Sequence, residues 1–171
     1  RMRIDSSGDT FVNGCVNHAT TEGNTNLQIL TTNGQGANLG GSIGLGGVYH
    51  ATNQITFGEI HGKKENSTTA NLAGYLSFVT RSSGGSSEKA RLTSGGNLLV
   101  GTTSTPSGST DGTVIFASGT IASYRTSAAP AVFSRNASNG GEVVVIQQQG
   151  TTVGSIGAHS GGGTYFYSNS G

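Results

Sequence analysis

The chain has 171 residues, a formal net charge of +1 and 30 glycines, and only 10% of its residues are charged. Nine Lys and Arg are balanced by eight Asp and Glu, which argues against a nucleic-acid partner. The single cysteine, Cys15, excludes a disulfide within the chain. No apolar run is long enough to span a membrane. Because only 32% of the residues are hydrophobic, we expect other chains to complete the burial of its core.

The first predicted element is a β-hairpin at the start of the chain. Residues 2–4 (MRI) and 10–12 (TFV) form its strands, and the connecting DSSGD places Gly8 where a turn requires a positive φ. Residues 90–100 repeat the same pattern, with Arg91 and Gly96 at the places of Arg3 and Gly8. An internal repeat is typical of an array of modules.

Two longer strands are predicted between the hairpin copies, at 53–62 (NQITFGEIHG) and 71–81 (NLAGYLSFVTR). Strict alternation divides the residues of the first into two groups on opposite faces: Ile55, Phe57, Glu59 and His61, and Thr56, Gly58 and Ile60. It divides those of the second into Leu72, Leu76 and Phe78, and Ala73, Tyr75 and Val79. Both faces carry apolar residues, which indicates strands covered on both sides, most simply by a neighbouring subunit.

The later part of the chain echoes the earlier part. Residues 151–163 (TTVGSIGAHSGGG) share the sequence GSIG with residues 40–47 (GGSIGLGG). Residues 102–112 (TTSTPSGSTDG) have no apolar side chain and read as a linker. The domain prediction is therefore a first module at 1–101, whose terminal hairpin is shared with the next module, a linker at 102–112 and a second, partial module at 113–171.

No helix is predicted, because glycine interrupts every stretch of helical periodicity. The fold class expected is all-β: an elongated, intertwined homotrimeric fibre built of repeated hairpin and strand modules. Three copies around an axis could bury hairpin faces that one copy leaves open, and shared strands would remove exposed sheet edges.

Catalytic and metal chemistry find little support in the sequence. Glu59 and Glu65 flank His61 and two lysines, which is the one arrangement that could serve general acid–base catalysis of glycoside hydrolysis, but a ladder of surface charges explains it more simply. No histidine has a partner at metal-ligand spacing; the four are His18, His50, His61 and His159. We therefore predict no catalytic residues, no metal and no cofactor.

Carbohydrate binding is harder to dismiss. Aromatic rings offer flat apolar faces to sugar C–H groups, while adjacent polar groups meet the hydroxyls. The predicted receptor or glycan contacts are Tyr49, His50, Tyr124, Arg125, Tyr165 and Tyr167. Packing of the same rings in a core or between subunits is the alternative.

Several stretches together resemble the distal tail fibres of tailed bacteriophages: RMRIDSSG, LGGSIGLGGVY, the run from Gly58 to Thr103, and GGEVVVIQQQGTTVGSIGAHSGGGTYFYSN. More closely, they are similar to fibres that precede an endosialidase-type intramolecular chaperone domain. The run from Gly58 to Thr103 carries the most specific part of the resemblance. The chaperone domain itself has no counterpart in residues 1–171, so its processing residues correspond to no position here.

The resemblance implies a viral structural protein in the virion, extracellular and part of the phage tail. Its expected role is a shaft or near-tip segment of a trimeric fibre that presents a surface for attachment to a host-cell glycan or protein. The implied partners are two further copies, other tail fibre or virion proteins and the host surface, with no nucleic acid and no membrane insertion. The alternatives are a bacterial or archaeal extracellular filament or adhesin subunit and, less favoured, a virion-borne polysaccharide depolymerase.

Overall fold

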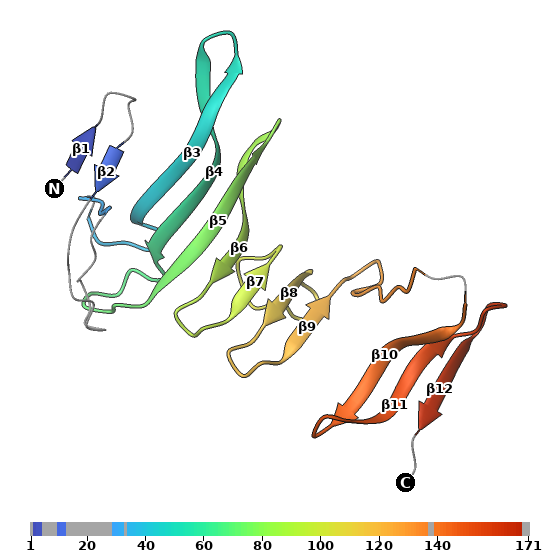
Figure 1. The fold of residues 1–171 in the computed structure, drawn as a ribbon. Helices are drawn as coiled ribbons and strands as arrows, with labels where there is room; N and C mark the ends of the chain where they lie inside the picture. The colour runs from blue at the N-terminus through green and yellow to red at the C-terminus, as the bar shows by residue number, and fades with distance from the viewer. Residues whose placement is uncertain (1, 5–9, 13–28, 33, 137–138, 169–171) are drawn as a thin grey trace. The chain divides into compact units, whose positions relative to one another are not determined.

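The computed structural model describes residues 2–4, 10–12, 29–32, 34–136 and 139–168. Within these ranges every regular element is a β-strand, and no helix is present, so the all-β prediction is confirmed there. The chain divides into two compact units, Arg1–Thr126 and Ser127–Gly171 (Figure 1).

The first unit is built around one antiparallel sheet of seven strands that follow one another in chain order, from β3 to β9. The strands are β3 (Gly40–His50), β4 (Asn53–Lys64), β5 (Gly74–Ser82), β6 (Gly85–Leu92), β7 (Leu98–Val100), β8 (Gly112–Ile115) and β9 (Ile121–Tyr124). The strands shorten from β3 and β4 towards β9 (Figure 1). Each neighbouring pair is joined by a direct connection, so the sheet is a meander with β3 and β9 at its two edges.

The predicted hairpin copies are both present as antiparallel strand pairs. β1 (Met2–Ile4) pairs with β2 (Thr10–Val12), and Arg3 lies opposite Phe11. In β6 and β7, Arg91 lies opposite Leu99, which is the same register after the shift from Arg3 to Arg91. Gly8 lies outside the described residues, whereas its counterpart Gly96 has a φ of 79°, as the pattern predicts.

One turn recurs at three hairpins of the described chain, at 93–97, 116–120 and 159–163. In each, the first residue's N–H donates to the fifth residue's carbonyl, and the fourth residue's N–H donates to the first residue's carbonyl. The fourth residue is always a glycine with positive φ: Gly96 at 79°, Gly119 at 88° and Gly162 at 88°. The left-handed region disfavours any side chain with a Cβ, which is why glycine holds this place.

Gly119→Ala is expected to lower the free energy of unfolding by roughly 1–2 kcal/mol, because alanine must adopt a left-handed conformation there. A Cβ at Gly119 would meet no atom within 4 Å, so the cost would come from backbone conformation alone. Gly108→Ala is the matched control, since Gly108 has equally open surroundings and no positive φ. Urea unfolding of the two variants checks the difference, and equal midpoints would contradict it.

Two β-bulges change which side chains share a face. The pair Leu45–Gly58 is followed by the pair Gly46–Thr56, so β4 has one extra residue, Phe57, between them. The predicted strict alternation through residues 55–61 is therefore wrong at Phe57, and the Thr56 hydroxyl donates to the Glu59 carboxylate at 3.2 Å. A second bulge, at Lys89, separates the pairs Phe78–Ala90 and Val79–Glu88.

The second unit has a three-stranded antiparallel sheet, with β10 (Gly141–Gln148), β11 (Thr151–Ala158) and β12 (Thr164–Ser168) in chain order. The central strand β11 contains the repeated GSIG sequence, and its Gly154, Ser155 and Gly157 are buried. A Cβ at Gly157 would collide with the Tyr165 ring of β12. The glycine thus allows the aromatic ring to lie flat across the strand.

The residues predicted as an inter-module linker have a place inside the first unit. Residues 101–111 connect β7 to β8, two directly paired strands of the same sheet. Within this connection Pro106 is buried. The compact units divide further along the chain, between Thr126 and Ser127.

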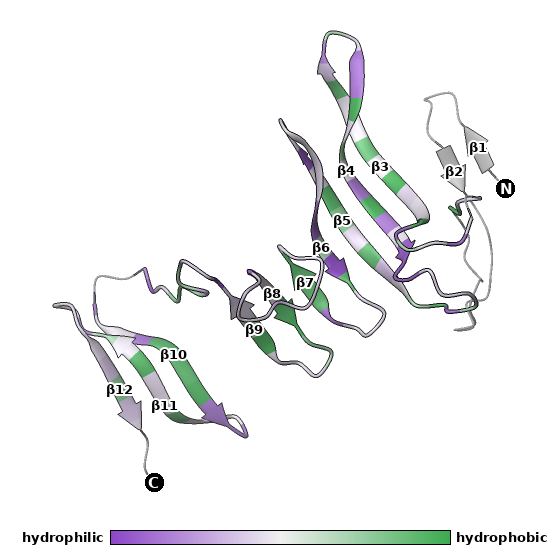
Figure 2. Cartoon of the chain, turned by 180° about the vertical axis from the view of Figure 1, so that it is seen from behind, coloured by the Kyte–Doolittle hydropathy of each residue, from purple (hydrophilic) through white to green (hydrophobic). Residues whose placement is uncertain are grey.

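Few apolar side chains are buried among the described residues. The buried hydrophobic residues are Tyr75, Leu99 and Val114, with exposed fractions of 6%, 1% and 0%. Hydrophobic positions nevertheless recur along β3, β4, β5, β7 and β8 (Figure 2). Many apolar side chains of these strands are therefore left partly exposed by the chain itself.

Candidate functional site

Strand register divides the seven-stranded sheet into two faces of different chemistry. One face, which we name the apolar face, carries large apolar residues paired across all seven strands. Its members are Ile43, Leu45, Ile60, Leu76, Phe78, Ala90, Leu92, Leu98, Val100, Ile115 and Ile121. None of these members is charged, but two lysines are on the same side of the sheet. Lys64 follows Gly62 by two residues on β4, and Lys89 donates to Ser87, which lies opposite Thr80.

Much of the apolar face is open to solvent. Eight of its side chains are at least 38% exposed: Ile43, Leu45, Leu76, Phe78, Leu92, Val100, Ile115 and Ile121. A single exposed apolar residue is ordinary on a protein surface, but a contiguous patch of this kind marks an interaction site. The apolar face is the main candidate interaction surface of the first unit.

The opposite face, which we name the polar face, carries ion pairs. Glu88 and Arg91 lie on the same face because the bulge at Lys89 interrupts the alternation between them. Arg91 donates to Glu88, with 2.9 Å between Nη2 and Oε2, and the Arg91 guanidinium lies 4.1 Å from the centre of the Tyr75 ring. The hydrogen bond to Glu88 raises the pKa of Arg91.

Tyr75 ties this face to the segment that precedes β3. Its hydroxyl donates to the Asn38 side-chain oxygen at 2.8 Å. Burial raises the pKa of Tyr75, so its hydroxyl keeps the proton that this bond requires.

Glu59 and His61 share a face, as the sequence predicts. His61 Nε2 lies 2.6 Å from Glu59 Oε2, and this hydrogen bond lowers the pKa of Glu59. On the neighbouring strand Ser77 lies opposite His61 and is fully buried. Neither Ser77 Oγ nor His61 Nδ1 has a hydrogen-bond partner among the described residues. A substrate would have no access to a serine hydroxyl buried in this way.

Glu65 does not join Glu59 in a carboxylate pair. Both of its oxygens accept hydrogen bonds from Ser94, one from the backbone N–H at 2.8 Å and one from the hydroxyl at 2.6 Å. These bonds lower the pKa of Glu65. Glu65 therefore fixes the β6–β7 turn to the connection that follows β4.

Glu65→Gln is expected to reduce the sensitivity of the fold to acid. Because the folded-state pKa of Glu65 is below its ordinary value of 4.5, its contribution is present above pH 4.5 and is lost as the pH falls through the folded-state pKa. Wild type should lose roughly 1 kcal/mol more than the variant between pH 7 and pH 3, after allowance for solvent exposure. Urea unfolding at both pH values checks this, with Glu142→Gln as control. Equal losses in wild type and Glu65→Gln would contradict the role.

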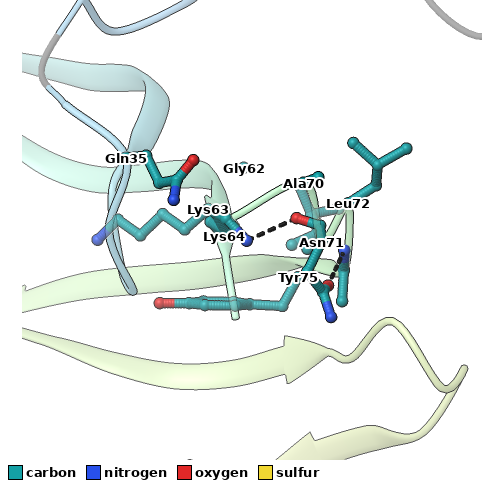
Figure 3. A pocket seen from close by; sticks show the side chains of 11 residues that line it. Gln35, Gly62, Lys63, Lys64, Ala70, Asn71, Leu72 and Tyr75 are labelled. Atoms are coloured by element: carbon teal, nitrogen blue, oxygen red, sulfur yellow. Dashed lines mark hydrogen bonds between the residues drawn. The ribbon is translucent and has the colours of Figure 1, made fainter. Parts of the chain in front are cut away.

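An open groove of about 580 Å³ lies beside the end of β4 and the start of β5 (Figure 3). The Lys64 ammonium donates to the Asn71 carbonyl at 2.6 Å, and the Gln35 amide donates to the Thr69 hydroxyl at 2.8 Å. Lys63 also lines the groove, and its ammonium has no hydrogen bond or ion pair with any described residue. The exposed side chain of Leu72 adds an apolar surface.

The predicted aromatic contacts of the first unit lie at opposite edges of its sheet. Tyr49 and His50 end β3, with ring centres 6.5 Å apart, and Tyr49 is 59% exposed. Tyr124 ends β9, and the Arg125 guanidinium lies 3.4 Å from the Asp111 carboxylate. The structure therefore does not bring these two pairs together.

Tyr165 and Tyr167 belong to the second unit and lie opposite Gly157 and Ser155 of β11. Tyr165 packs against His159, with ring centres 5.2 Å apart, whereas Tyr167 is 55% exposed. The exposed ring of Tyr167 is the better placed of the two for a ligand.

Neither the Arg91–Glu88–Tyr75 cluster nor the groove was predicted from the sequence. The cluster depends on a bulge that strict alternation does not reveal. The groove depends on the long connection after β4, whose course no periodicity predicts. The one local signal for the groove was the pair of lysines at the end of a predicted strand.

No protein-family model, curated protein or solved structure matches the chain. Within the described ranges, no three His, Cys, Asp or Glu side chains form a group that could hold a metal ion. The same ranges contain no helix long and apolar enough to cross a membrane.

Proposed function

We propose that the chain is a structural segment, shaft or near-tip, of a homotrimeric tail fibre of a tailed bacteriophage. The observation that carries the proposal is the sparse core: Tyr75, Leu99 and Val114 are the buried hydrophobic side chains of the described residues. A single-layer sheet with so few buried side chains gains little stability alone. Association of identical chains supplies the missing burial, and repeated hairpins extend the assembly along an axis.

The proposed fibre also presents an attachment surface to the host cell. Two places offer exposed aromatic or apolar side chains beside polar groups, the end of β3 at Tyr49 and His50 and the groove at Lys63 and Leu72. Tyr167 offers a third in the second unit. Weak sites of this kind bind tightly enough when each is repeated three times on one particle.

Binding of the fluorescently labelled chain to a panel of intact bacterial strains tests the attachment role. We expect binding to a subset of strains, reduced several-fold in Tyr49→Ala or Tyr167→Ala and unchanged in Thr103→Ala, an exposed loop residue. Absence of binding to every strain would contradict an attachment surface in this segment and leave the shaft role. Release of soluble sugar from capsular polysaccharide, abolished in Glu59→Gln, would favour the depolymerase instead.

A further inference from the structure

We propose that the apolar face is the surface through which copies of this chain join, and that the hollow beside Gly62 receives an apolar side chain of the adjoining copy. The proposal rests on the proposed function only in taking the number of joined copies to be three. It assigns the two faces of the sheet to different roles, the apolar face to assembly and the polar face to the outside.

The extent of the face fits an interface between proteins. Its eight exposed side chains average about half exposure and together present several hundred Å² of apolar surface. Apolar patches of this size on soluble proteins are often functional. A stable interface buries roughly 800 Å² on each partner, of which somewhat more than half is apolar, so the face can supply most of the apolar part.

The chemistry of the face favours another copy over an unrelated charged partner. The cross-strand row of Leu76, Leu92 and Leu98 has no charged side chain that could pair with a charge on the partner. The charged side chains Glu59, Glu88 and Arg91 are on the polar face and are already paired with each other or with His61. The two lysines on this side, Lys64 and Lys89, donate to groups of the chain itself, so the apolar rows are the main surface left to meet a partner. In a homo-oligomer the same surface is always available on the next copy.

The apolar face also has a hollow that a side chain of a second copy can fill. A hollow of about 200 Å³ is lined by Ile29, Ile43, Ile60, Leu76 and the glycines at 41 and 62. A Cβ at Gly62 would meet no atom within 4 Å, so the space is open. At the other edge of the sheet Ile121 is 69% exposed. A projecting residue and an empty hollow on one face allow the head-to-tail contacts that close a cyclic ring.

Filling the hollow tests the contact without disturbing the isolated fold. Gly62→Val adds a side chain into open space on a strand, where valine is well tolerated. We expect this variant to remain folded by circular dichroism and to raise the dissociation constant of the assembly at least tenfold by analytical ultracentrifugation. Gly108→Val, also in open space, is the control and should assemble as wild type does. Assembly of Gly62→Val at wild-type affinity would overturn the role of the hollow.

Cross-linking tests the assignment of the face itself. In a Cys15→Ser background, Phe78→Cys places a thiol on the apolar face and Val79→Cys places one on the polar face. A short bis-maleimide should link copies of Phe78→Cys and not copies of Val79→Cys. Linking of Val79→Cys alone, in a chain that still assembles, would overturn this inference and leave the proposed fibre standing. A monomeric wild type would overturn both this inference and the proposed trimer. Absence of binding to bacterial cells, with assembly intact, would contradict only the attachment role.

Discussion

Leu92→Lys should convert the assembled chain into monomers at micromolar concentration. Leu92 lies near the centre of the apolar face, between Leu76 and Leu98 on the neighbouring strands, and is 42% exposed in the single chain. A lysine there keeps its charge in water in the monomer. Burying its ammonium against another copy without a partner would cost several kcal/mol, which changes a dissociation constant by a factor of a thousand or more.

Thr103→Lys is the matched control for this variant. Thr103 is exposed in the connection after β7, and its replacement adds the same charge away from the apolar face. Light scattering at a series of concentrations compares the two. Leu92→Lys that assembles as tightly as Thr103→Lys would show that the apolar face does not join copies.

Leu99→Ala should lower the free energy of unfolding by about 2–4 kcal/mol, as removal of a buried leucine usually does. Leu99 is 1% exposed and lies between Arg91 and Val114 on the polar face of the sheet. The loss combines the transfer of its methyl groups with the cavity that remains. Because so few apolar side chains are buried, this one change should remove a large share of the stability of the first unit.

Val100→Ala, one residue further along β7, separates burial within the chain from burial between chains. Val100 is 45% exposed on the apolar face. Its replacement should cost well below 1 kcal/mol in dissociated chains and more in the assembled form, where the face is covered. Urea unfolding at low and high protein concentration measures both. Equal costs for Leu99→Ala and Val100→Ala in dissociated chains would contradict the observed core.

The strands were predictable because their sequence signals are local. The turn glycines and the short apolar runs on either side predict both hairpin copies, and the register at Arg3 and Arg91 follows from turn length. The bulges at Phe57 and Lys89 were not predictable in this way. A bulge depends on how two strands fit together, and neither strand alone shows it.

The candidate site could be predicted only in part. Alternation between neighbouring residues was enough to place Glu59 beside His61, and the 2.6 Å contact confirms it. It was not enough to place Arg91 over Tyr75, since that contact joins two strands whose register neither strand shows alone. The predicted contacts at Tyr49 and Tyr124 lie at opposite sheet edges because six strand pairings separate them. Which face a second copy covers is likewise a property of the assembled strands.

The native mass of the chain in solution, by light scattering after size exclusion, tests the central claim most directly. The claim is that copies of this chain complete a core that one copy leaves open. A mass near three times 17.2 kDa is the predicted result. A stable, folded monomer at high concentration would contradict it, because the apolar face would then remain in water.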